Sequence, residues 1–219
     1  MTAVPAPRPA HRLIPSKFPP IGLFDTVATA ADLEAVMELA GWTNDRLVAQ
    51  RIARLPRAEW AFGRPNASIV MAAFLHAASG GGRFNGPDLG AWYASADLTT
   101  AAAEVGHHLR REAVARDEPV LRRTFRAYIS RLEGRYLDIR GATRPDLHAS
   151  DSYAAGQEFG VAERARGGDG IVYDSVRRRG GVNVVAYRPS KVTDVAQAEH
   201  FDIAVSAAER RIEVMHLGK

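Results

Sequence analysis

The first third of the chain repeats hydrophobic residues at the spacing of an α-helix. Thr29 and Asp32 stand at capping-box spacing before one such stretch, and Gly41 ends it. Asn44 can cap a second stretch, which Pro56 stops. The apolar positions of the two stretches are Leu33, Val36, Met37 and Ala40, then Leu47, Val48, Ile52 and Leu55. The pattern therefore predicts two amphipathic helices.

A third hydrophobic stretch, from Ala67 to Ala78, is apolar on nearly every side and ends at the glycines 80–82. A helix without a polar face is usually buried, so we expect this helix inside the protein. Ser68 and His76 interrupt the stretch, which is too short to span a bilayer. We therefore expect a protein without membrane association.

Beyond the glycines the pattern changes to the period of a β-strand. Hydrophobic and polar residues alternate over 125–130, which predicts a half-buried strand. We expect 135–139 to be the neighbour of that strand. Further strands are predicted over 11–20, 91–95, 170–173, 182–187 and 212–217, and helices over 98–112 and, capped by Asp151, to about 166. Helices come first and mixed elements follow, which favours an α+β fold.

Composition indicates one globular domain of 219 residues, with 46% hydrophobic and 25% charged residues. Residues 1–10 are rich in proline, alanine and arginine, and we expect a disordered lead-in. The domain then covers 11–219, with a helical portion at about 25–80 and the main motifs at 80–190. Residues 1–20 contain six prolines and no apolar run, so no signal peptide is expected.

The absence of cysteine excludes a disulfide scaffold, a cysteine nucleophile and a thiolate metal site. A cytoplasmic location fits this composition best. Three of the 29 basic residues are lysines and 26 are arginines, at a net charge of +4. The arginine excess has two explanations: genome composition, or arginines that bind phosphate bidentately. Arginine pairs are scattered, so we expect no direct binding of nucleic acid.

Several common motifs are missing. Asn85 occupies the third glycine position of a dinucleotide-binding fingerprint, and the only Gly-Lys pair ends the chain. Neither H-E-x-x-H nor G-x-S-x-G occurs. Glu104, His107 and His108 have a helical spacing that a metal could use, but adjacent histidines on an arginine-rich helix are more often solvated. We expect no metal.

The segment 80–110 carries the most chemical information. Arg83 follows three glycines, whose backbone can approach a ligand closely. Tyr93 comes next in a predicted strand, and Glu104 lies on the helix after it. An arginine for a diphosphate, an aromatic ring for a planar base and a carboxylate for a sugar suit a nucleotide–sugar bond. Residue types alone fit equally well a glycine turn, a core tyrosine and a surface glutamate.

The order of the motifs adds a resemblance. The run GGRFN, WYAS…AAAE and DGIVYDSVR, with HRLIPSKFPP before it, resembles the RES-domain family, named for an arginine, a glutamate and a serine. The resemblance covers about 11–189. It implies an ADP-ribosyltransferase-like mixed β core with an N-terminal helical portion, NAD⁺ as the substrate without a metal, and a role as the toxin of a toxin–antitoxin system. An Xre-like antitoxin is the implied partner.

The resemblance also implies site residues. The arginines of the family fall on Arg12 and Arg83, the strand tyrosine on Tyr93, the helix glutamate on Glu104 and a common serine on Ser175. Where many members have serine or threonine, this chain reads YAAGQ at 153–157. The serine role is thus open between Ser175, Ser152 and no residue at all. About 70 residues separate the two arginines, as in a longer subgroup.

The implied reaction breaks the bond between nicotinamide and ribose. Glu104 would stabilise the positive charge that develops on the sugar, as in glycoside hydrolysis. Arg12 and Arg83 would bind the diphosphate, Ser175 would contact the nucleotide, and Tyr93 would pack against nicotinamide. The acceptor of ADP-ribose remains open between water, phosphate and a host protein. The alternative function is a non-catalytic basic module that binds a nucleotide or nucleic acid.

Overall fold

The computed structural model describes residues 1–17, 22, 24–29, 31–33, 35, 46–141 and 144–218. In this part of the chain nine strands form one sheet in the order β1-β5-β6-β7-β3-β2-β4-β8-β9. The strands are β1 (Ala3–Val4), β2 (Ala10–Pro15), β3 (Trp92–Ser95), β4 (Val120–Leu132), β5 (Tyr136–Asp138), β6 (Gly170–Asp174), β7 (Val182–Ala186), β8 (Val192–Ser206) and β9 (Ile212–Leu217). The β5–β6 pair is parallel and the other neighbours are antiparallel.

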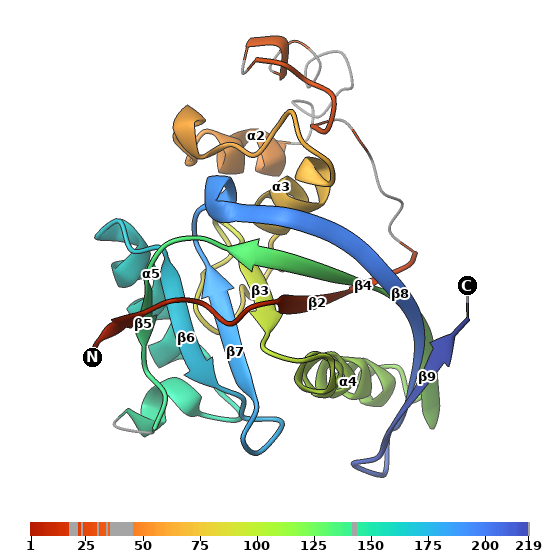
Figure 1. Cartoon of the computed structure of the whole chain (residues 1–219). Helices are drawn as coiled ribbons and strands as arrows, with labels where there is room; N and C mark the ends of the chain where they lie inside the picture. The colour runs from red at the N-terminus through yellow and green to blue at the C-terminus, as the bar shows by residue number, and fades with distance from the viewer. Residues whose placement is uncertain are drawn as a thin grey trace.

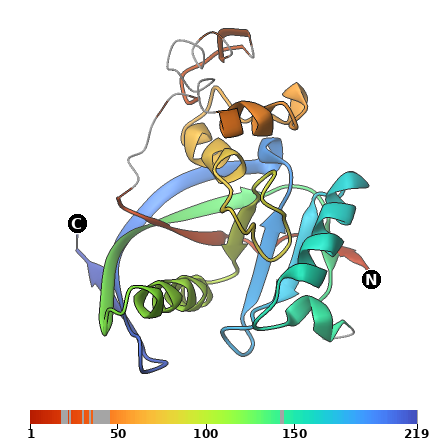
Figure 2. The ribbon, with the colours of Figure 1, turned by 180° about the vertical axis from the view of Figure 1, so that it is seen from behind.

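Helices pack around this sheet. The helices are α2 (Arg46–Ile52), α3 (Ala67–Leu75), α4 (Leu98–Ala115) and α5 (Ala154–Ala165), with 3₁₀ turns η2 (Arg57–Glu59), η3 (Pro145–His148) and η4 (Pro189–Lys191). The long strands β4 and β8 form a curved arch, with α2 and α3 above it and α4 beneath it (Figure 1). From behind, α5 stands in front of β6 and β7 (Figure 2).

Strand alternation gives the sheet two different faces. Trp92, Val172 and Val184 belong to a core shared with α3. Tyr173 and Val185 point the other way, into a core shared with α5. On the arch, the apolar stripe of α4 packs against residues of β2, β4 and β8. The helices α4 and α5 thus contact different strands and leave space between them.

Most elements with a clear period are confirmed. The buried helix α3, the helix α4 and the strands β3, β4, β6, β7 and β9 lie where the sequence predicts them, within a few residues. Thr29 and Asp32 form the expected capping contacts, with a hydrogen bond of 3.1 Å from the Asp32 backbone N–H to Thr29 Oγ1. Val36, Met37, Ala40, Gly41 and Asn44 lie outside the described residues.

The predicted cap at Asp151 is wrong. The N-cap residue of α5 is Tyr153, and its side chain makes no capping hydrogen bond. Because the helix begins at Ala154, Asp151 lies outside it. Ser152 Oγ instead accepts a hydrogen bond of 3.3 Å from the Ala154 backbone N–H.

The expected pairing of β5 with β4 is also wrong, because β5 pairs with β1 and β6. Gly134, between β4 and β5, has a φ of 102°, a conformation that favours glycine. The next residue, Arg135, donates its backbone N–H to Asp169 Oδ2 at 2.9 Å, just before β6. This turn directs the chain away from β4.

Two further segments differ from the sequence-based expectation. Ala3–Val4 pairs with β5, so these residues of the expected disordered lead-in belong to the sheet. Their pairing uses main-chain groups, which composition does not reveal. No strand is predicted over Val192–Ser206, yet β8 pairs with β4 along most of its length. Residues 196–199 of β8 are all exposed, which hides the alternation.

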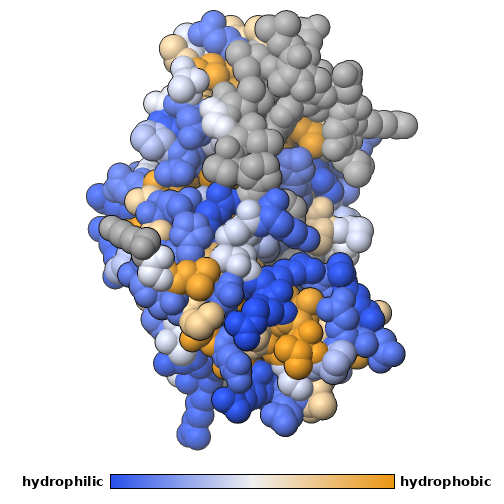
Figure 3. Space-filling view, turned by 90° about the vertical axis from the view of Figure 1, so that its right-hand side faces the viewer, coloured by the Kyte–Doolittle hydropathy of each residue, from blue (hydrophilic) through white to orange (hydrophobic). Residues whose placement is uncertain are grey.

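One face of the molecule is shown by residue hydropathy in Figure 3. Seen from the side of β9 and the C-terminus, it is largely hydrophilic, with an apolar patch in the lower half (Figure 3). Within the described residues, no helix is long and apolar enough to cross a membrane.

Candidate functional site

A pocket of about 340 Å³ lies on the face of the sheet that carries α4 and α5. It is lined by His11, Arg12 and Leu13 of β2, Gly81–Arg83, Tyr93, Ala94 and Ser95 of β3, Ala101, Glu104, Val105 and His108 of α4, Tyr153, Tyr173 of β6 and Asn183 of β7. Four of the five predicted site residues, Arg12, Arg83, Tyr93 and Glu104, are among them. The fifth, Ser175, reaches the site through Glu104.

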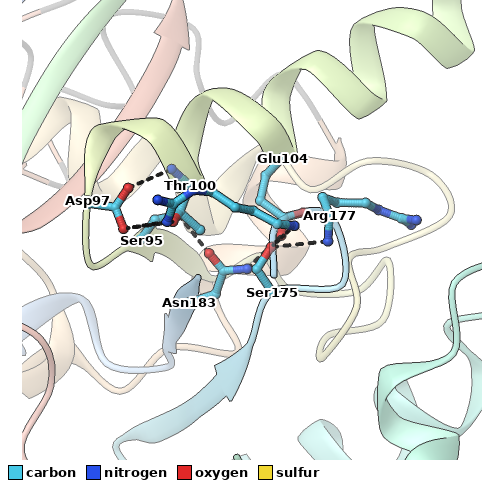
Figure 4. A network of polar contacts seen from close by, with 8 residues as sticks. Ser95, Asp97, Thr100, Glu104, Ser175, Arg177 and Asn183 are labelled. Carbon is cyan, nitrogen blue, oxygen red and sulfur yellow. Dashed lines mark hydrogen bonds and ion pairs between the residues drawn. The ribbon is translucent and has the colours of Figure 1, made fainter. Parts of the chain in front are cut away.

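Glu104 projects from α4, whose first turn is fixed by Asp97. The Asp97 carboxylate accepts the Thr100 backbone N–H at 2.8 Å and so caps the helix. Two donors hold Glu104 Oε1: Ser175 Oγ at 2.7 Å and Asn183 Nδ2 at 2.6 Å (Figure 4). Oε2 accepts no hydrogen bond from any described residue. One carboxylate oxygen is therefore fixed, and the other remains available to a ligand.

Ser175 contacts the glutamate and does not line the pocket. Its Oγ accepts the backbone N–H groups of Arg177 at 3.1 Å and Arg178 at 3.0 Å and donates to Glu104 (Figure 4). Ser175 therefore orients Glu104, and its direct contact with a nucleotide stays a prediction. Ser152 is not among the lining residues.

Arg83 connects the glycine loop to the segment before α5. Its Nη1 donates to the carbonyl oxygens of Leu147 at 3.2 Å and Ala149 at 2.8 Å. The guanidinium carbon lies 4.7 Å from the centre of the Tyr153 ring. Nη2 has no hydrogen-bond partner among the described residues. Arg83 therefore holds η3 with one nitrogen and offers another to the pocket.

Arg12 is a half-buried cation at the junction of β2 and β3. The two strands pair only at His11 and Ser95, and beside this pair Arg12 Nη1 donates to the Tyr93 carbonyl at 2.9 Å. The guanidinium lies 4.6 Å from the centre of the Trp92 ring, and Nε is buried without a partner. Burial lowers the pKa of Arg12 to about 10. Among the described residues no carboxylate pairs with it, so an anion would stabilise this charge.

Tyr93 places its ring in the pocket and its hydroxyl in the glycine loop. The hydroxyl donates to Asn85 Oδ1 at 2.7 Å and accepts the Phe84 backbone N–H at 2.9 Å. Burial raises the pKa of Tyr93, which keeps the hydroxyl neutral. The ring is therefore suited to packing against a ligand, while the hydroxyl is engaged in positioning the loop.

Sequence reasoning missed several residues of the site. Asn183 is 2% exposed and Ser95 3% exposed, and Ser95 Oγ donates to Asn183 Oδ1 at 2.7 Å. A polar residue inside the hydrophobic strand 182–186 is the signal that could have revealed Asn183. His108 was considered only as a metal ligand, although it lines the pocket. Desolvation of the ring, opposed by the charge of Glu104 and aided by nearby arginines, lowers the pKa of His108.

No metal centre is apparent in the part of the chain that the structure describes. It contains no group of three or more histidine, aspartate or glutamate side chains placed to hold an ion.

The family model of the RES domain matches residues 51–206. This match covers most of the chain, so the chain belongs to the RES domain family. Its fold is similar to that in the crystal structure of the M. tuberculosis MbcT–MbcA toxin–antitoxin complex, at 14% sequence identity and a TM-score of 0.50. The match covers 94% of this chain and 88% of that chain. The expected α+β class is confirmed. Among curated proteins, no sequence matches the chain.

Proposed function

We propose that this chain is the toxin of a toxin–antitoxin system and that it cleaves the bond between nicotinamide and ribose in NAD⁺. One observation carries the proposal. Glu104 has one oxygen held by two donors and the other unpaired, in a pocket that also contains two arginines and aromatic rings. Membership of the RES domain family supports the same reaction.

The carboxylate serves the bond cleavage. Nicotinamide leaves as a neutral base and takes the bonding electrons, so positive charge develops on the ribose. A carboxylate beside the sugar stabilises this charge and accepts hydrogen bonds from ribose hydroxyls. Because Ser175 and Asn183 hold Oε1, Glu104 needs little reorganisation as the charge forms.

The arginines and aromatic rings serve binding. Arg83 offers a free guanidinium nitrogen to the diphosphate, and Arg12 adds a half-buried positive charge that no described carboxylate neutralises. The ring of Tyr93, with those of Tyr153 and Tyr173, provides flat apolar surfaces for nicotinamide. Each of these groups acts before the bond breaks, by orienting the substrate.

The acceptor of ADP-ribose and the protein partner complete the proposal. Water, inorganic phosphate or a side chain of a host protein can take the ADP-ribose. The protein partner is an Xre-like antitoxin that covers the pocket. The structurally similar protein was crystallised as a toxin–antitoxin complex, which supports a partner of this kind.

The direct test is release of nicotinamide from NAD⁺ by the purified chain. We expect release, and three reactions identify the acceptor: buffer alone, added phosphate, and cell lysate with labelled NAD⁺. Stimulation by phosphate selects phosphorolysis, and label on a lysate protein selects ADP-ribosylation. Binding of NAD⁺ without release of nicotinamide in all three reactions would instead support the non-catalytic binding module.

The matched variants are Glu104→Gln and Glu209→Gln. Glu104→Gln removes the charge in the pocket, and we expect a loss of nicotinamide release of at least about 100-fold and no growth inhibition. Glu209 is exposed in the loop before β9 and serves as the control. Both variants should melt like the original chain. Full activity of Glu104→Gln contradicts the proposal.

A further inference from the structure

A buried chain of hydrogen bonds reaches Glu104 from the side of the sheet. Ser95 Oγ on β3 lies 2.7 Å from Asn183 Oδ1 on β7, and Asn183 Nδ2 lies 2.6 Å from Glu104 Oε1. Ser95 and Asn183 face each other in the antiparallel β3–β7 pair. Figure 4 shows the three side chains in one line of contacts. The chain therefore joins two strands to the carboxylate on α4.

The contacts of Ser175 determine which atom is the donor in its hydrogen bond with Glu104. Ser175 Oγ already accepts two backbone N–H groups, from Arg177 and Arg178. A hydroxyl has two acceptor sites and one proton, so its proton is directed to Glu104. Oε1 of Glu104 is consequently the acceptor at this contact.

The same logic fixes the amide of Asn183. An acceptor at Glu104 Oε1 needs the NH₂ group of Asn183, which places the amide oxygen toward Ser95. Ser95 must then donate its proton to that oxygen. A reversed amide would place two oxygens against each other in a nearly solvent-free position, which is unfavourable.

We infer that Asn183 is a positioning residue, which holds Oε1 of the Glu104 carboxylate as a hydrogen-bond acceptor, and that Ser95 fixes the orientation of the Asn183 amide. Neither residue contacts the reacting bond in this assignment. Asn183 acts through Glu104, and Ser95 acts through Asn183. The consequence for catalysis rests on the proposed function, but the coupling between positions 183 and 104 does not.

Other titratable and charged groups line the pocket around Glu104 and also respond to a change of pH. The pocket contains Arg12 and His11 from β2, Arg83 from the glycine loop, His108 from α4 and the three tyrosines named above. None of them donates a hydrogen bond to Glu104 in the described residues. A change at position 183 alone therefore alters the direct partner of the carboxylate and leaves these groups in place.

Asn183→Asp is the informative variant, because it has nearly the same shape and keeps an acceptor for Ser95. It replaces the donor facing Glu104 by a second carboxylate. Two adjacent carboxylates share one proton when the pH is low enough and repel each other when both are ionised. The introduced group can therefore imitate Asn183 at pH 5 but not at pH 8.

Thermal melting tests the coupling without reference to activity. We expect Asn183→Asp to lower the melting temperature by about 5 °C more at pH 8 than at pH 5, relative to the unchanged chain. In the Glu104→Gln background this pH-dependent difference should shrink by more than half, because the second carboxylate is gone. An equal pH dependence with and without Glu104 would overturn the inference.

Nicotinamide release tests the role in catalysis. For Asn183→Asp we expect kcat to fall about tenfold or more at pH 8, with a smaller change in KM, and to recover partly toward pH 5. Asn183→Ala should show a loss that does not depend on pH. If the ratio of the kcat of Asn183→Asp to the kcat of the unchanged chain stays constant between pH 5 and pH 8, the positioning role is contradicted.

Ser95→Ala tests the second part of the chain. Without its donor the Asn183 amide is free to rotate, and we expect a loss in kcat of about threefold to tenfold. Ser130→Ala is the matched control, since Ser130 is 3% exposed like Ser95 but lies on β4 outside the pocket. Equal effects of the two serine variants would show that Ser95 only fills space. If the original chain releases no nicotinamide, the proposed function fails, and the melting experiment still decides the coupling.

Discussion

Gly156 of α5 lies directly against the main-chain carbonyl oxygen of Arg83. A Cβ atom at position 156 would be 2.4 Å from that oxygen, closer than two such atoms approach each other. One turn later, a Cβ at Gly160 would be 2.1 Å from the Phe84 carbonyl oxygen. The two glycines let α5 approach the loop that carries Arg83. The absence of a serine or threonine at 154–156 therefore coincides with a close backbone contact.

Gly156→Ala should displace the loop that carries Arg83. We expect a melting temperature lower by about 5 °C and a KM for NAD⁺ higher by about tenfold, because the added methyl group displaces a backbone carbonyl. The control is Glu158→Gln, at an exposed position of the same helix. A variant with unchanged KM and stability would mean that α5 does not position Arg83. Melting and steady-state kinetics provide both readouts.

Ser175→Ala separates the two serines that the sequence left open. Loss of one of the two donors to Oε1 should lower kcat by about tenfold to 100-fold, with little change in KM. Ser152→Ala should be neutral, because Ser152 is exposed and does not line the pocket. The reverse order of effects would assign the serine role to Ser152. Rates measured over a range of NAD⁺ concentrations distinguish these outcomes.

Arg12→Met should weaken NAD⁺ binding without weakening the fold. Burial lowers the pKa of Arg12 to about 10. The charge on Arg12 therefore lowers the free energy of unfolding at every pH below that value. Stability from this group rises with pH only above about 10, as the folded protein loses the proton before the unfolded chain does. Removing the charge should leave the melting temperature unchanged or raise it by up to about 5 °C.

Thermal melting in the presence of NAD⁺ measures how Arg12→Met affects binding. NAD⁺ should raise the melting temperature of the original chain but not that of the variant, because only binding to the folded state stabilises it. Arg54→Met is the control, since Arg54 is exposed and forms only a 3.6 Å surface ion pair with Asp88. A strongly destabilised variant would show that Arg12 has a structural role, and a variant still stabilised by NAD⁺ would show that Arg12 is not required for binding.

His107→Gln should reduce the sensitivity of the fold to acid. Burial, and secondarily Arg177, His108 and other basic neighbours, lower the pKa of His107 to about 4. The unfolded chain binds this proton at about pH 6.5, so stability falls as the pH drops from about 6.5 to 4.

The His107 contribution is at most about 2 kcal/mol once solvent screening of this partly exposed group is allowed for. Urea unfolding at pH 7 and pH 4.5 gives the difference for the original chain and for the variant. We expect the difference to be smaller in His107→Gln. An identical loss of stability in both proteins would assign the acid sensitivity to other groups.

Local signals in the sequence predicted much of the fold. Helix α4 follows from its spacing of apolar residues, and β4 follows from the alternation that begins at Phe125. These signals depend on neighbours a few residues apart. The strand β8 escaped prediction because residues 196–199 are exposed, and β1 escaped because its contacts are made by the main chain.

The sequence by itself determined the chemical groups of this protein: a carboxylate, two arginines and an aromatic residue in a fixed order, with no cysteine. Only the tertiary structure decided how they meet. Ser175 and Asn183 reach Glu104 across 71 and 79 residues, and the turn at Gly134 sends β5 away from β4. Such contacts arise when strands pair across the sheet, and no local period records that pairing. Burial, which gives Arg12 its unbalanced charge, is likewise a property of the folded chain.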